Sequence, residues 1–230
     1  MKEKPNYTRY GGVSISYADG DASYSRGSGD NHSRAMNFYV TEMGNKGHYL
    51  DVVLRFHHMD TNFKMFDENG KKIRGDMHNV GISLSSEYGR KKMIDDKGWY
   101  IEPQGQLTIG YLGGDNYTTS NGIAVRQGGI RSALGRIGFN LGKDIDEKTN
   151  IYLKANLLHE FGGGYHAAMA DSSGSRIKID RSFKDTWFEY GIGAAIQTGT
   201  NNHVYLDFER SAGGDFKKDW SWNVGARWTF

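Results

Sequence analysis

The chain has 230 residues, a formal net charge of +2 and no cysteine, which excludes disulfide bonds, thiolate metal sites and cysteine nucleophiles. Its mean hydropathy is -0.67 and its longest nearly apolar run, residues 191–196, is far too short for a membrane-spanning helix. Basic residues are scattered rather than clustered, so we expect no nucleic-acid partner.

The first half of the chain predicts five strands. Side chains alternate across a strand, so apolar residues two apart share one face. The fifth strand has the clearest alternation, although Pro103 interrupts it, and proline is usually confined to sheet edges or bulges. The predicted strands cover residues 13–17, 36–41, 49–56, 80–88 and 99–111.

The second half predicts five more strands, at residues 132–141, 151–161, 187–197, 204–209 and 220–230. In the last of these, every even position from Trp220 to Phe230 is apolar, and most are aromatic. Polar residues fill most of the odd positions. A strand that is aromatic on one face, and on which the chain ends, is typical of the C-terminus of an outer-membrane β-barrel.

The connections support a barrel. Short connections, at residues 143–149 and 198–202, alternate with long polar ones, predicted as loops, at residues 61–76, 113–129 and 162–185. Barrel strands need only about 10 residues, half of them facing the lumen, so a hydrophilic chain with 32 glycines, 30 aromatic residues and 2 prolines fits this class. The sequence predicts an all-β, antiparallel, up-and-down transmembrane barrel of about ten strands, with both termini on the periplasmic side.

Residues 1–9 contain no apolar segment, so they do not form a secretory signal. We expect residues 1–10 to be an N-terminal extension and residues 11–230 to form one barrel domain. The polar faces of the strands would then line the lumen, bracing the barrel or holding a transported polypeptide, ions or a plug. The lumen-facing residues expected are Asp51, Arg55, Glu87, Tyr100, Glu102, Gln104, Gln106, Arg136, Lys154, Glu160, Glu189 and Arg227.

The residues leave two other classes of function open. A small outer-membrane enzyme would use a histidine and a carboxylate at the barrel rim, and His57, His58 and Asp60 lie together near a strand end. His159 precedes Glu160, but adjacent strand residues point to opposite faces and make a poor catalytic couple. No catalytic residue is therefore assigned. A passive channel or structural anchor is the third possibility.

Several segments, in order, carry a family resemblance. GWYIEPQGQLTIGY, residues 98–111, resembles a "WYLEPQAQL" strand that includes the proline, and SALGRIGFNLG, residues 132–142, resembles the "RLGLRLG" strand that follows it. Residues 47–56, 81–90 and 151–161 and the terminal WNVGARWTF resemble further strands of the same family. The chain thus resembles the C-terminal translocator barrel of type V autotransporters, of the AIDA and pertactin-like group.

The resemblance implies a barrel in the bacterial outer membrane, at the cell surface, in contact with membrane lipid and lipopolysaccharide. It implies type V secretion of an N-terminal passenger that is covalently linked in the precursor and is not present in this chain. It implies recognition of the closing strand by the barrel-assembly machinery, and it implies no nucleotide, metal or other cofactor. The expected assembly signal consists of Trp222, Val224, Trp228 and Phe230.

Family barrels typically have twelve strands and a helix in the pore, whereas the alternation here predicts about ten strands and no helix before residue 11. The first strands and the pore helix are therefore expected to be missing. Two interpretations remain open: ten strands close alone, since an even number permits antiparallel closure, or another chain completes the sheet. The second interpretation includes a substrate held partly folded on the assembly machinery.

Overall fold

The computed structural model describes residues 7–199 and 202–228, and within them the chain is entirely β-structure and turns. Each main strand pairs antiparallel with the next. In these ranges there is no helix long and apolar enough to cross a membrane. The main strands are β1 (Tyr7–Tyr24), β2 (Gly27–Gly44), β3 (His48–Phe66), β4 (Lys72–Arg90), β6 (Trp99–Leu112), β9 (Ile130–Asp144), β10 (Thr149–Glu160), β13 (Asp185–Gly199), β14 (Asn202–Ala212) and β15 (Ser221–Trp228).

The ten main strands confirm the predicted fold class, but the three long polar loops are corrected. Residues 61–76 are mostly the ends of β3 and β4. Outside these three loops, a two-residue strand, β5 (Lys92–Met93), pairs with β6. The other two loops carry a second, four-stranded sheet of β7 (Asn116–Thr118), β8 (Ala124–Gln127), β11 (Gly164–Ala170) and β12 (Arg176–Ser182). The strands of this second sheet are short and lie in segments of polar composition, so alternation such as that of Ile177 and Ile179 with Lys178 and Asp180 was not recognised.

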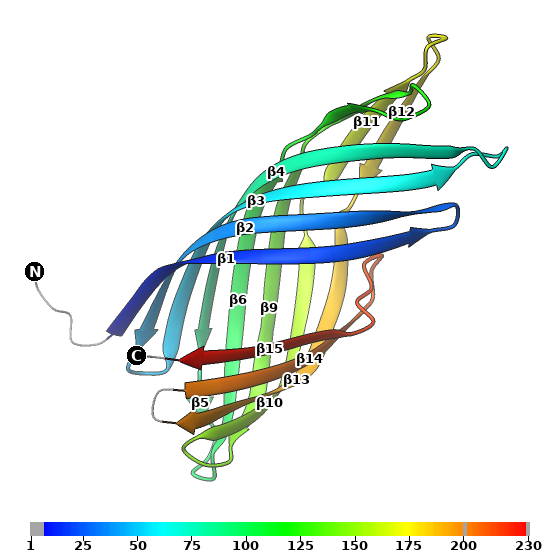
Figure 1. Ribbon diagram of the computed structural model, residues 1–230. Coiled ribbons are helices and arrows are strands. Elements are labelled where there is room, and N and C mark those ends of the chain that lie inside the picture. Colours follow the sequence, from blue (N-terminus) through cyan, green and yellow to red (C-terminus); the bar gives the residue numbers. More distant parts are fainter. Residues whose placement is uncertain (1–6, 200–201, 229–230) are drawn as a thin grey trace, which may run out of the picture.

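The sheet is curled, with β1 and β15 at its two edges (Figure 1). Within residues 7–199 and 202–228, β1 pairs only with β2 and β15 only with β14. The start of β1 and the end of β15 lie at the same end of the sheet, which also carries the turns that join β2 to β3 and β9 to β10 (Figure 1). β1 begins at Tyr7, inside the segment expected as an extension, and the division at residue 10 stays a prediction.

The two faces of the sheet differ in polarity. On β4, Val80, Ile82 and Leu84 share one face and are 63, 42 and 43% exposed, although they are aliphatic. Glu87 lies on the other face and forms an ion pair with Arg136 of β9, across the intervening strand β6. Side chains can meet over an intervening strand only where a sheet is concave, so the polar face lines the lumen and the apolar face points outward.

A row of tyrosines lies on the concave face, each directly opposite a glycine of the next strand. A Cβ built at any of these glycines would lie between 2.1 and 2.6 Å from the tyrosine ring or hydroxyl, so only glycine leaves room for the ring. The tyrosine covers backbone that the glycine leaves bare, as in the aromatic rescue of strand glycines. The pairs join alternate strand pairs along the whole sheet: Gly12 and Tyr39, Tyr49 and Gly89, Tyr100 and Gly142, Tyr152 and Gly193, and Tyr205 and Gly225.

Candidate functional site in the lumen

Arg136 of β9 is the centre of a first group of lumen side chains. Its Nη2 lies 2.8 Å from Glu87 Oε2, and the two side chains are only 17 and 21% exposed. In the sheet register Glu87 faces Gln106, and Gln106 faces Arg136, so the arginine reaches over β6 to the carboxylate. The guanidinium also donates to three amide oxygens, those of Gln106 at 2.8 Å, Asn156 at 2.9 Å and Gln104 at 3.2 Å. We call these five residues the arginine cluster.

Lys154 of β10 starts a second group. Its Nζ lies 3.1 Å from Asp207 Oδ1 and 3.0 Å from Glu209 Oε2, both on β14. Gly191 of β13 stands between Lys154 and Glu209 in the register, and a Cβ there would lie 3.0 Å from Lys154 Cε. Because Gly191 has no side chain, it leaves room for the lysine side chain to cross β13.

A loop completes this second group. Lys218, between β14 and β15, turns into the lumen, where its Nζ lies 3.0 Å from Glu189 Oε1 and also pairs with Glu209. Its backbone is held by Ser211, whose N–H donates to the Lys218 carbonyl at 3.0 Å. Tyr152 donates to Asp207 at 2.8 Å, and Trp187 donates to Glu189 at 3.1 Å. We call Tyr152, Lys154, Trp187, Glu189, Asp207, Glu209 and Lys218 the lysine cluster.

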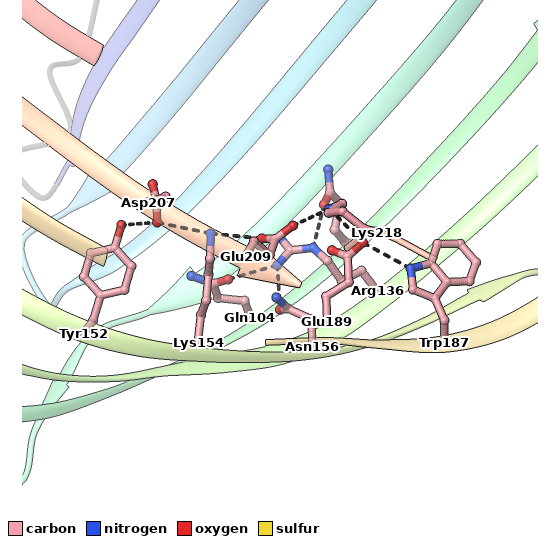
Figure 2. Close-up of polar contacts among 11 residues, drawn as sticks. Gln104, Arg136, Tyr152, Lys154, Asn156, Trp187, Glu189, Asp207, Glu209 and Lys218 are labelled. Atoms are coloured by element: carbon pink, nitrogen blue, oxygen red, sulfur yellow. Dashed lines mark hydrogen bonds and ion pairs between the residues drawn. The ribbon is translucent and has the colours of Figure 1, made fainter. Parts of the chain in front are cut away.

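The two clusters lie side by side on the concave face (Figure 2), and members of both line one cavity of about 390 Å³. The lysine cluster holds three carboxylates against two ammonium groups, which leaves one formal negative charge, whereas the arginine cluster is balanced. Because each charge faces an opposite charge over a neighbouring strand, the groups brace the wall of a polar cavity and still present charge to whatever enters it.

The other predicted lumen residues make mostly local contacts, and of these residues Glu102 also contacts a member of the arginine cluster, Gln104. Asp51 accepts from the Thr41 hydroxyl at 2.5 Å, and Arg55 donates to Asn37 at 2.7 Å. Tyr100 is 5% exposed, and Lys91 Nζ lies 4.0 Å from its ring centroid. Glu102 accepts hydrogen bonds from the side chains of Gln104 and Asn140. Glu160 accepts from the Ser132 hydroxyl and from the backbone N–H groups of Ala133 and Gly162. The backbone of Arg227 pairs with that of His203, and its side chain lies outside the described part.

The predicted assembly signal is described only in part. Trp222 and Val224 of β15 are 71 and 67% exposed on the outward face, where the Trp222 ring lies 5.2 Å from that of Phe208. Trp228 is the last residue of β15, but its side chain is not described, and Phe230 lies outside the described residues.

Sequence reasoning did not single out six members of the clusters. Five of them had a usable signal, because each lies on the polar face of a predicted strand: Tyr152, Asn156, Trp187, Asp207 and Glu209. Lys218 had none that an alternation pattern would reveal. Lys218 lies in a loop, and only the folded path of that loop brings its ammonium group to Glu189.

The histidines considered for catalysis are distributed over both faces. His159 bonds Thr186 Oγ1 at 2.7 Å on the outward side, whereas Glu160 turns inward to Ser132, so the two do not act on each other. His57 occupies an inward position opposite Gly81, while His58 and Asp60 share the outward face.

Comparisons with known proteins agree with this geometry. Residues 4–209 match the autotransporter beta-domain family. The pertactin autotransporters of Bordetella parapertussis and Bordetella bronchiseptica are each 31% identical to the chain over 220 residues, which are 93% of the chain and 23% of the relative. The chain therefore belongs to the autotransporter beta-domain family, and its place is the bacterial outer membrane. It spans about a quarter of the length of these curated relatives.

Two solved structures share the fold. The beta domain of the Bordetella autotransporter BrkA is 25% identical, with a TM-score of 0.76, covering 96% of this chain and 84% of the other. The translocator domain of the autotransporter NalP from Neisseria meningitidis has a TM-score of 0.78 at 12% identity, covering 96% and 76%. The predicted translocator-type β-structure is thereby confirmed.

Proposed function

We propose that this chain is the translocator of a longer precursor and that its lumen carries or anchors an N-terminal passenger on its way to the cell surface. The observation that supports this most is the combination of an outward apolar face with two charged clusters around a lumen cavity of about 390 Å³. The outward face fits a lipid environment. The clusters keep the concave face wet and charged, as the passage of a polypeptide requires.

We assign the lumen role to the twelve residues expected from the sequence and extend it to the other members of the two clusters. The enzyme alternative is not favoured, because His159 and Glu160 turn to opposite faces and the clustered carboxylates are held by lysines or an arginine. The translocator role of this chain is proposed to be non-enzymatic, so any enzymatic activity of the precursor would belong to its passenger.

We further propose two partners for the outward surface. The first is outer-membrane lipid, including lipopolysaccharide, because the outward residues are mostly aliphatic and aromatic in the first half of β3 and the second half of β4. The second is the barrel-assembly machinery, which would read Trp222, Val224, Trp228 and Phe230. The free backbone edge of β15, within the described residues, suits pairing with a strand of such a partner.

The test is carried out in the precursor that contains this chain, with an epitope tag placed upstream of Met1. Intact cells are treated with a protease that does not cross the outer membrane. We expect the tag to be cleaved while the chain stays in the outer-membrane fraction. A folded chain in that fraction with a fully protected tag would contradict the export function.

The same precursor tests the assembly signal. The double substitution Trp228→Ala, Phe230→Ala should slow insertion about tenfold, equivalent to about 1.4 kcal/mol in the barrier, because the machinery loses its two terminal anchors. Phe66→Ala is the control, since Phe66 is an exposed aromatic at the far end of β3. Pulse-labelling followed by heat-shift electrophoresis measures the rate. Equal rates for both variants would eliminate the terminal signal.

A further inference from the structure

His58, Asp60 and His78 form a compact group on the outward face, and no lumen function uses it. His58 and Asp60 are two residues apart on β3, and His78 of β4 is directly opposite Asp60 in the register, so all three project from the same face. The group comes just after Phe56 on β3 and just before Val80 on β4, which belong to the apolar surface. It therefore lies beyond the apolar band, toward the end of the sheet away from both termini. We call it the rim triad.

The three side chains converge on one point. Their possible ligand atoms all lie within 4.8 Å of one another. Asp60 Oδ1 is 2.9 Å from His58 Nε2 and 2.7 Å from His78 Nδ1, so one carboxylate oxygen faces both imidazoles. Tetrahedral Zn²⁺ with bonds of about 2.0–2.1 Å places its ligand atoms roughly 3.3 Å apart, so small side-chain rotations would bring the triad to coordinating distances.

We propose that the rim triad binds one divalent transition-metal ion, with Zn²⁺ or Ni²⁺ as the best match, through His58 Nε2, Asp60 and His78 Nδ1. Two imidazoles and one carboxylate form a donor set that suits these borderline ions better than Mg²⁺ or Ca²⁺, which prefer oxygen ligands. Water would complete the coordination, because the side chains of His58 and His78 are 45 and 64% exposed. The metal would replace the two hydrogen bonds that now join the imidazoles to Asp60.

The surroundings hold the triad in place. Asp115 Oδ2 accepts a hydrogen bond of 2.7 Å from the backbone N–H of His78, which fixes β4 at this point. The His58 and His78 rings are stacked with centroids 6.4 Å apart. His32 of β2 is opposite Asp60 on its other side and is itself paired with Asp19. Such outer contacts orient ligands and support metal affinity.

Charge also favours a cation at this place. The carboxylates of Asp115 and Asp76 also act electrostatically on His78, so the rim triad lies in a region of negative charge. A proton on His78 competes with a metal, so binding is best measured at about pH 8, above the usual histidine range.

The test is calorimetric titration of the folded, untagged chain in detergent micelles with Zn²⁺, and separately with Ni²⁺. We expect one ion per chain. His58→Asn and His78→Asn should each weaken binding at least about tenfold, since each removes one of three protein ligands. Binding should survive a large excess of Mg²⁺.

His166→Asn is the matched control. His166 is also exposed and bonds a carboxylate, that of Asp180 at 2.5 Å, but the described residues around it supply no second histidine. Heat-shift electrophoresis of each variant shows whether it is folded before titration. The proposal is overturned if the folded wild-type chain binds no Zn²⁺ or Ni²⁺, if His166→Asn weakens binding as much as His58→Asn, or if Mg²⁺ displaces the ion.

Discussion

Replacing Arg136 with methionine is expected to lower the free energy of unfolding by about 2–4 kcal/mol, because one partner of a shielded ion pair is lost while the other remains. Glu87 would keep only the hydrogen bond from Tyr49, at 2.6 Å. The amide oxygens of Gln104, Gln106 and Asn156 would also lose their shared donor. Urea unfolding in micelles, followed by tryptophan fluorescence, measures the change.

Two further variants make that measurement specific. Arg181→Met, at an exposed position of β12, removes the same charge and should change stability by less than about 0.5 kcal/mol. The double variant Arg136→Met, Glu87→Gln should be more stable than Arg136→Met alone, because no unpaired carboxylate remains. A loss for Arg136→Met no larger than that for Arg181→Met would show that the arginine cluster does not brace the barrel wall.

Gly142→Ala is expected to cost about 1–3 kcal/mol and to slow folding into the membrane, because an added methyl group overfills the contact with a tyrosine. A Cβ at Gly142 would lie 2.3 Å from the Tyr100 ring. That ring is 5% exposed and lies under Lys91 Nζ, so it cannot turn aside without breaking other contacts. The same urea titration, with heat-shift electrophoresis for the rate, gives both quantities.

The control for this glycine lies on the neighbouring strand. A Cβ at Gly105 of β6 would have no atom within 4 Å, so Gly105→Ala should leave stability nearly unchanged. Combining Gly142→Ala with Tyr100→Ala should add less than the sum of the two single losses, because each removes the same packing. If Gly142→Ala behaves like Gly105→Ala, the tyrosine and glycine pairs are not structural joints.

Much of the fold was predictable because the main strands separate an apolar face from a polar one. Even Pro103, which lowers the quality of a strand pattern, lies inside β6 opposite Phe139, and the alternation on both sides of it still marks the strand. At the ends of β3 and β4 the alternation reverses, because polar residues take over the outward face and apolar ones lie inward, while the backbone pairing continues. The apolar residues that lie inward there are Phe63, Met65, Ile73 and Met77.

The site was less predictable because its partners lie on strands that are not neighbours. The sequence places Arg136 and Glu87 on polar faces, but their ion pair depends on the curl of the sheet over β6. Lys154 reaches β14 only because Gly191 leaves room between them. Lys218 depends on a loop path that no local pattern encodes.

Cysteine labelling is the most direct test of the claim that the apolar face meets lipid and the polar face encloses an aqueous lumen. The chain has no cysteine, so single substitutions are read without background. Leu84 and Ser85 are neighbours on opposite faces of β4, and Leu107 and Thr108 are neighbours on opposite faces of β6. Each of the four is replaced by cysteine in a separate variant. Each variant is treated with a charged maleimide, which does not enter lipid, once it is assembled in the outer membrane.

In the protein without lipid, the side chains of Leu84 and Leu107 are 43 and 52% exposed, which is more than those of the inward residues Ser85 and Thr108. In the membrane we predict the reverse: the cysteines at positions 85 and 108 react, and those at 84 and 107 are protected until detergent replaces the lipid. Faster labelling at 84 and 107 in intact membranes would contradict a lipid-facing apolar surface, and with it the account of this chain as a membrane translocator.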